Sequence, residues 1–255
     1  IVNDDLSLYP ELNKATAQLQ VPWFHVPGNH DLDFDSANDQ HSLDSWRAVY
    51  GPDTYAVEEG GASFVFLDDV VYDPNNKPKY IGGLRPDQFT FLANYLKALP
   101  RDRLLVLGMH IPLFDAAPGR ETFRHADRAR LFALLKDFPH VLVLSGHSHT
   151  QQHYYHGAAE GWQGEKPLHE YNVGAACGAF WSGVKDGNGI PDATMSDGTP
   201  NGYAVLSVKP AGEYALRYYV ARAPDDYQIA VHAPKVLRKG AYPAWGVYAN
   251  VFMGQ

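Results

Sequence analysis

The 255-residue sequence contains a single cysteine, Cys177, which excludes an internal disulfide. It has no run that approaches the about 20 apolar residues of a membrane-spanning helix. Basic residues are also scarce: 21 Lys and Arg stand against 29 Asp and Glu, a net charge of −8. Because no basic stripe is visible, we expect no nucleic-acid partner. The hydrophobic content of 45% and the charged content of 20% are those of an ordinary globular protein.

The first part of the chain, up to His149, alternates between apolar β-prone runs and segments with helical spacing of apolar residues. Helices are expected over 6–19, from a Ser42 cap to 50, from Pro86 onward, and over 126–136. Strands are expected over 21–26, 55–58, 62–67, 104–107 and 141–144, the second and third forming a hairpin around Glu59-Gly60-Gly61. Strand–helix alternation in this order predicts a layered α/β fold.

After His149 the pattern changes to short strands joined by Gly-rich loops. Strands over 151–156, 168–173, 203–208 and 214–220 would supply the second sheet of a two-sheet core. The long loop 180–201 is expected to be a lid or binding surface. A linker begins at Ala223, and the apolar strand 247–252 has no expected partner, so we interpret it as the start of a further β-rich domain. The predicted division is therefore 1–222 and 223–255.

Three histidine-bearing segments follow apolar runs: Gly28-Asn29-His30-Asp31, Gly108-Met109-His110 and Gly146-His147-Ser148-His149. Strands that stop at a glycine place the next side chains at the carboxyl edge of a sheet, where open α/β sheets build their sites. Convergence of Asn29, His110, His147 and His149 would create a metal site. Imidazole with amide or carboxylate oxygen suits Mn, Fe, Zn or Ni alike.

Each segment taken alone has a structural alternative. Gly-Asn-His-Asp is also a plausible turn, because Gly and Asn tolerate left-handed backbone. A single histidine after a strand is more often structural than a ligand. His147 and His149 carry more weight, because alternate residues of an extended segment project to the same side. The combination of all three segments favours a metal site. Cys177 is expected to be a small buried apolar residue, with a zinc ligand as the less favoured alternative.

These motifs resemble those of the calcineurin-like metallophosphoesterases, over roughly residues 1–222. A narrower likeness, in 187–191 and 192–203, is to a bacterial branch whose catalytic domain is flanked by β-rich domains. The resemblance implies a four-layer fold, a two-sheet sandwich flanked by helices. It also implies hydrolysis of small phosphomonoesters or phosphodiesters at two divalent metal ions, with a metal-bridging hydroxide as nucleophile. An exported bacterial protein is implied by likeness alone.

The resemblance also assigns roles to residues. Asn29, His110 and His147 would hold one metal, and His149 would help to hold the other. His30 would donate a proton to the leaving group, with packing beside the turn as its structural alternative. Asp31 resembles the carboxylate that orients this imidazole and favours its charged form.

The sequence departs from the family pattern at its beginning. An Asp-x-His and a Gly-Asp motif are missing, and Ile1-Val2-Asn3-Asp4-Asp5 looks like the residues that follow the second of them. We therefore expect that the first strand and the remaining metal ligands lie upstream, and that these residues alone are poorly soluble and essentially inactive. A non-catalytic binding module on the same scaffold is the alternative function. The intact histidine motifs favour the enzyme.

Five further residues are weaker candidates. Asp4 and Asp5 are expected to be either partners of the site residues or helix N-terminal acids. Arg120, Arg124 and His125 follow His110 in sequence and would either contact the phosphate or leaving group, or be solvated loop charges, the interpretation we favour.

Overall fold

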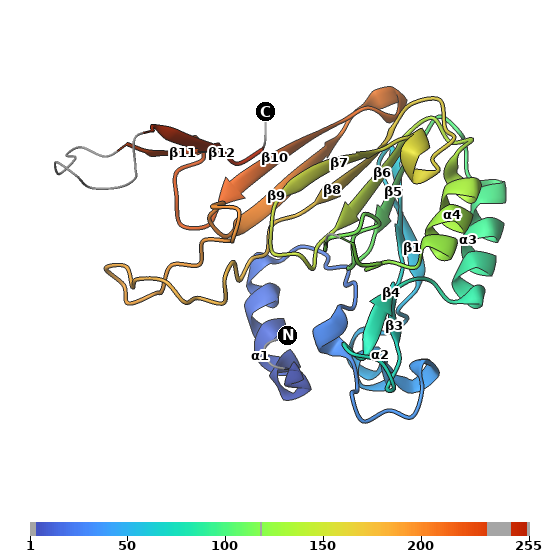
Figure 1. Cartoon of the computed structure of the whole chain (residues 1–255), viewed down its shortest axis with the longest axis horizontal. Helices are drawn as coiled ribbons and strands as arrows, with labels where there is room; N and C mark the ends of the chain where they lie inside the picture. Colours follow the sequence, from blue (N-terminus) through green and yellow to red (C-terminus); the bar gives the residue numbers. More distant parts are fainter. Residues whose placement is uncertain (1–3, 118, 234–245, 254–255) are drawn as a thin grey trace. The chain divides into compact units, whose positions relative to one another are not determined.

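The computed structural model describes residues 4–117, 119–233 and 246–253. The chain divides into two compact units, each described by itself below. Unit 1 comprises residues 1–148, 154–171 and 208–213, and unit 2 comprises 149–153, 172–207 and 214–255. The elements of both are labelled in Figure 1. Within the described residues, no helix has both the length and the apolar character needed to cross a membrane.

Unit 1 is built on a six-stranded sheet with the order β1-β2-β5-β6-β8-β7. Strands β1 and β2 form an antiparallel hairpin, whereas β2, β5 and β6 run parallel to one another. The bounds are β1 Tyr55–Glu59, β2 Ala62–Phe66, β5 Leu104–Gly108, β6 Val141–Ser145, β7 Gln152–His156 and β8 Leu168–Asn172. Every residue of β5 is buried. The carboxyl ends of three adjacent parallel strands therefore meet at one edge of the sheet.

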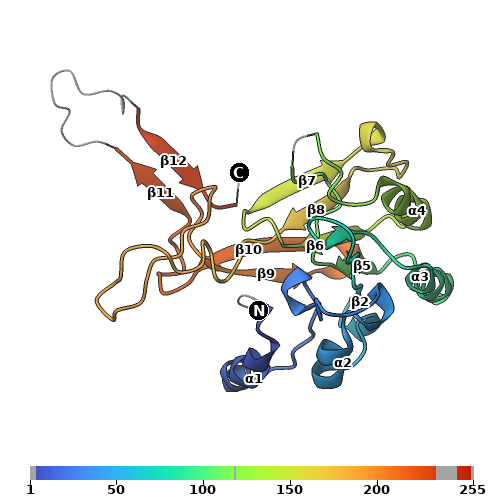
Figure 2. The same ribbon diagram turned by 60° about the horizontal axis from the view of Figure 1, so that its bottom comes forward.

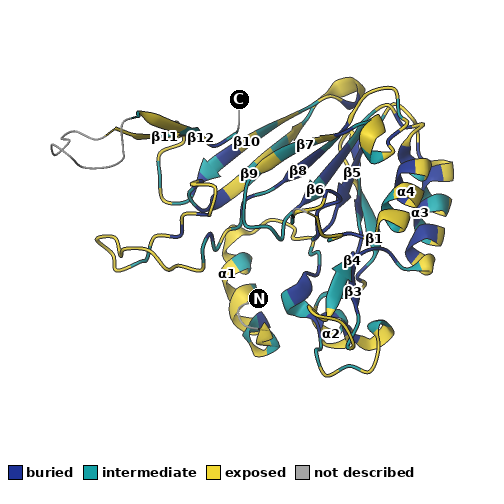
Figure 3. Cartoon of the chain, in the orientation of Figure 1, coloured by how far each residue is buried: buried dark blue, intermediate teal, exposed yellow. Residues whose placement is uncertain are grey.

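Two amphipathic helices lie side by side against this sheet, as Figures 1 and 2 show. They are α3 (Pro86–Ala98) and α4 (His125–Leu135). Figure 3 shows their buried faces in dark blue, and the buried residues include Phe89, Leu92, Leu131 and Phe132. The hairpin of β3 (Val70–Tyr72) and β4 (Tyr80–Gly82) leads from β2 to α3. Helix α2 (Asp44–Tyr50) buries Trp46 in the same core.

Unit 2 contains two small antiparallel sheets and long loops. Strand β10 (Tyr214–Val220) pairs with β9 (Gly202–Val208), and β11 (Ile229–His232) pairs with β12 (Tyr248–Val251). A small core of Met195, Tyr218, Val220 and Phe252 holds this unit together.

The predicted α/β fold is confirmed, as are the hairpin and the helices that precede and follow β5. Segment 6–19 is helical as expected, with α1 (Tyr9–Thr16) flanked by short 3-10 turns. The second helix begins at Asp44, because the Ser42 hydroxyl bonds to the Asp39 carbonyl instead of capping it.

Three expectations about strands are wrong. Residues 21–26 have no ladder hydrogen bonds and contact the sheet through side chains, such as Phe24 stacked on Phe66. Strands β7 and β8 extend the first sheet instead of joining a second one. Strand β12 has a partner in β11, whose Ile-Ala-Val-His sequence lies in the expected linker. The domain boundary after residue 222 stays a prediction.

Candidate metal centre and its surroundings

Three of the four predicted ligands converge at the carboxyl edge of the sheet in unit 1. The Nε2 atom of His110 lies 2.8 Å from Oδ1 of Asn29 and 3.2 Å from Nδ1 of His147. The third side of this triangle, from His147 Nδ1 to Asn29 Oδ1, measures 3.0 Å. We call Asn29, His110 and His147 the donor triad.

The donor triad fits a divalent metal ion. Atoms bound to one first-row metal at about 2.0–2.2 Å lie roughly 2.8–3.6 Å from one another, from octahedral to tetrahedral angles, and all three sides of the triangle lie in this range. Asn29 is buried, and neutral imidazoles with an amide oxygen suit such ions. Across the described part of the chain, no group of three or more His, Cys, Asp or Glu side chains is placed for metal binding. The donor triad is not such a group, because it consists of two histidines and an asparagine, whose side-chain amide is the third donor.

Parallel strand pairing places the two histidines of the triad side by side. The ladder continues past both strand ends, because Met109 N–H donates to Leu144 O and Gly146 N–H donates to His110 O, each at 2.9 Å. His147 then adopts the left-handed region, with φ of 66°. A non-glycine residue held there is typical of functional turns.

Two neighbours determine how His110 lies. Its ring packs against Gly28 so closely that a Cβ atom at residue 28 would be 2.8 Å from His110 Cε1. Asp69, fully buried beyond the end of β2, accepts hydrogen bonds from the N–H groups of His110 and Ile111, each at 2.9 Å. Burial raises the pKa of Asp69 well above its ordinary value, against the effect of these two donors.

His30 faces solvent beside the triad and is paired with a carboxylate. Its Nδ1 lies 2.6 Å from Asp4 Oδ1, and both side chains are 43% exposed. The contacts of Asp31 include the Gly28 N–H at 2.8 Å and the hydroxyl of buried Tyr9 at 2.9 Å. That Asp31 orients His30 stays a prediction; the carboxylate found against the imidazole is Asp4. Asp5, in contrast, accepts from Ser7 N–H as an ordinary helix cap.

Models of known protein families match most of the chain. The model of the family described as calcineurin-like phosphoesterase matches residues 2–151, more than half of the chain. This chain belongs to the calcineurin-like phosphoesterase family. A second model, described as the C terminal of calcineurin-like phosphoesterase, matches residues 170–255.

A curated relative is the probable glycerophosphodiester phosphodiesterase GpdQ of Arcobacter nitrofigilis. It is 28% identical over 155 residues, which cover 58% of this chain and 51% of the relative. The chain thus spans about half the length of this curated relative.

In this calcineurin-like phosphoesterase a buried carboxylate ties the two histidine loops together. Oε1 of Glu170, on β8, accepts from the Leu113 N–H at 3.0 Å and from the Ser145 hydroxyl at 2.7 Å. Its Oε2 lies 2.7 Å from Nε2 of His156, and neither side chain of this pair is exposed. Leu113 follows His110 and Ser145 precedes His147. Glu170 therefore connects the loop that carries His110 to the loop that carries His147.

His149, the fourth predicted ligand, belongs to unit 2. Its Nδ1 donates to Gly178 O at 2.8 Å, which leaves Nε2 as the nitrogen with a lone pair. Metal-binding histidines commonly make this bond to a backbone carbonyl. His149 also has a positive φ of 52°. That His149 joins Asn29, His110 and His147 stays a prediction.

Cys177 is half-buried, with Sγ 4.0 Å from His149 Nδ1.

The three cationic candidates after His110 have different surroundings. Arg120 lines a hollow that also borders His147. Arg124 lies 4.0 Å from Asp127 and borders a different hollow, near Arg47 and Arg85. His125 is paired with Asp115 at 2.8 Å.

Sequence reasoning missed Asp69 and Glu170. Asp68-Asp69 follows the apolar run of β2 just as the histidine motifs follow β5 and β6, so the same strand-end pattern could have found it. Glu170 lies inside a strand between Leu168 and Tyr171, and an acid flanked by buried apolar residues was the available signal.

Proposed function

We propose that this protein hydrolyses phosphoester bonds of small molecules in a reaction that depends on divalent metal ions. The observation that carries the proposal is the convergence of the donor triad in a chain that belongs to the calcineurin-like phosphoesterase family. The printed name of the Arcobacter relative, a glycerophosphodiester phosphodiesterase, supports phosphodiesters as one substrate class.

Asn29, His110 and His147 would hold one ion, and His149 would contribute to a second, giving a dinuclear centre. When bound, such a centre supplies a hydroxide nucleophile near neutral pH and positive charge that stabilises the transferring phosphoryl group. The rest of the chemistry belongs to the side chains. Asp69 and Glu170 hold the backbone on which the histidines lie.

His30 is proposed to protonate the departing alkoxide oxygen. It is adjacent to Asn29 in sequence and partly exposed, and an Asp4 carboxylate at its Nδ1 leaves Nε2 to carry the transferred proton. Asp4 then orients the ring through its contact with Nδ1.

The test is hydrolysis of bis(4-nitrophenyl) phosphate and 4-nitrophenyl phosphate by the chelator-treated full-length protein, with and without added Mn²⁺. We expect metal-dependent turnover that His110→Ala abolishes. His41→Ala is the matched control, because His41 is exposed and paired with Asp44 on the surface. Metal binding without turnover of either ester would instead support a non-catalytic binding module.

A further inference from the structure

A hollow of about 400 Å³ in unit 1 opens beside the donor triad. His147 forms part of its wall, together with Tyr80, Thr122 and Ser148. The Tyr80 ring meets the His147 imidazole edge to face, with centroids 5.9 Å apart. A substrate whose phosphate lies at the triad would therefore extend its organic part along this hollow.

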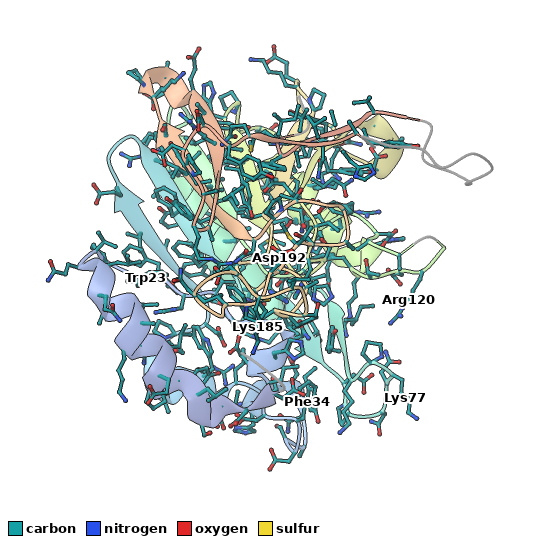
Figure 4. All side chains as sticks on the ribbon, turned by 90° about the vertical axis from the view of Figure 1, so that its left-hand side faces the viewer. Trp23, Phe34, Lys77, Arg120, Lys185 and Asp192 are labelled. Carbon is teal, nitrogen blue, oxygen red and sulfur yellow. The ribbon has the colours of Figure 1, made fainter. Side chains whose placement is uncertain are left out.

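Two cations border the hollow, Lys77 from the β3–β4 connection and Arg120 from the loop after β5. Figure 4 shows them on the same side of the molecule. Within the described residues, neither side chain forms an ion pair with a carboxylate, unlike the half-buried Arg47 and Arg85 elsewhere in unit 1. Both are exposed, so their charges remain free to act on a ligand.

The acids near these cations are already engaged. Glu121, which also lines the hollow, accepts from the His125 N–H at 2.6 Å. Asp115 accepts from the Thr122 N–H at 3.2 Å and lies 2.8 Å from His125 Nε2. Tyr80 adds a phenol hydroxyl to the wall of the hollow. The hollow thus presents two cations that form no ion pair within the described residues, together with the Glu121 carboxylate and the phenol hydroxyl of Tyr80, on a chain of net charge −8.

A larger hollow in the same unit is also bordered by cations, but its cations are paired with carboxylates. It is bordered by Arg47, Arg85 and Arg124. Arg47 and Arg85 both bind Asp53, and Arg85 also binds Asp68. Because these cations are neutralised within the fold, that hollow has little left with which to attract an anion.

We propose that Lys77 and Arg120 bind an anionic group on the organic part of the substrate. The favoured substrates are then phosphoesters with a second negative charge, a carboxylate or another phosphate, beyond the ester being cleaved. The inference rests on the proposed function and narrows its substrate class. Because neither cation belongs to the donor triad, both are assigned to recognition of the substrate, and their contribution belongs to KM.

The test uses a matched pair of 4-nitrophenyl aryl phosphodiesters. The retained ring carries a para-carboxylate in one and a neutral para-carboxamide in the other; a third ester with a para-phosphate distinguishes the two anions. We expect a lower KM for the anionic esters and similar kcat for all. Arg120→Gln and Lys77→Gln should each reduce this preference on the order of 5-fold, as expected for a partly exposed ion pair. Added salt should weaken it.

Lys97→Gln is the control, because Lys97 is exposed on α3 and does not border the hollow. Calorimetric titration with the corresponding non-hydrolysable phosphonates provides a readout without turnover, and it should show the same preference for the charged ligand.

Failure of the inference and failure of the proposed function give different results. Turnover of all esters with equal KM, or an equal loss on charged and neutral esters in Arg120→Gln, would overturn the recognition role alone. If the wild-type protein with Mn²⁺ cleaves none of them, the proposed function fails, and the substrate assignment that rests on it fails too.

Discussion

At the scale of single residues, Gly28 controls the position of the His110 imidazole. The φ of Gly28, −118°, can be adopted by any residue. A larger residue is therefore excluded by the nearby His110 ring and not by the backbone conformation. The three nearest atoms to an added Cβ all belong to His110, at 2.8 to 3.1 Å. A methyl group there must displace the ring from the donor triad.

We therefore predict that Gly28→Ala weakens Mn²⁺ binding by about 10–100-fold, the range found when support of a metal-binding histidine is lost. Gly61→Ala is the control, because its added Cβ would meet nothing closer than Val208 at 3.7 Å. Calorimetric metal titration of both variants measures the effect. Unchanged affinity in Gly28→Ala would show that the His110 ring is not held as the structure has it.

His30 is the second residue on which activity should depend. His30→Ala should lower kcat about 10²–10⁴-fold on alkyl phosphodiesters, which have poor leaving groups, and much less on 4-nitrophenyl esters. Metal content should stay at the wild-type level. Asp4→Asn should show the same selectivity to a smaller degree, because Asp4 acts through the imidazole. Equal losses on both ester types would rule out His30 as the proton donor.

At the scale of elements, the site depends on how loops after parallel strands are held together. Glu170 lies on β8, yet its carboxylate bonds to residues that follow β5 and end β6. His156 on β7 completes the pair, with both side chains fully buried. Strands β7 and β8, at the edge of the sheet opposite the β1–β2 hairpin, thus support the donor triad through the Glu170 carboxylate.

Glu170→Gln replaces the oxygen that faces His156 or Ser145 with an NH₂ group. We expect a loss of about 2–4 kcal/mol in the free energy of unfolding, as is typical when one partner of a buried polar pair is removed. Metal affinity should fall as well. Urea unfolding and metal titration measure the two effects, with exposed Glu59→Gln as control. A fully stable variant with weakened metal binding would assign Glu170 to the site alone.

Elements with strong local patterns could be predicted from the sequence, and their pairing could not. The apolar runs of β5 and β6 and the Gly60-Gly61 turn identify strands directly. Residues 21–26 have an equally apolar pattern, but a strand also needs a hydrogen-bonding neighbour, which the pattern does not reveal. Asn29 reaches the triad all the same, because side-chain packing such as Phe24 on Phe66 holds the segment against the sheet.

At the scale of the whole molecule, a buried ionic network connects α2, the end of β2 and the start of α3. Asp53 binds Arg47 at 2.6 Å and Arg85 at 3.1 Å. Burial of Asp53 favours its neutral form, but the charges of Arg85 and Arg47 prevail and lower its pKa. Burial raises the pKa of Asp68 to about 7, although Arg85 is bound to it.

A lowered pKa in the folded state means that ionised Asp53 stabilises the fold above its unfolded pKa, and that this contribution is lost as the pH falls through the folded value. Asp53→Asn should therefore lower the free energy of unfolding at pH 7 by about 1–3 kcal/mol. The difference from wild type should shrink toward pH 3. Urea unfolding across this range tests it, and a difference independent of pH would contradict the sign.

The structure brings together three predicted ligands from three distant segments, and this convergence is the basis of the proposed function. The most direct measurement is anomalous diffraction at the manganese edge from crystals soaked in Mn²⁺. We expect a peak about 2.0–2.2 Å from Asn29 Oδ1, His110 Nε2 and His147 Nδ1 together. A protein that hydrolyses phosphoesters with its manganese bound elsewhere, and nothing at the donor triad, would contradict the assignment.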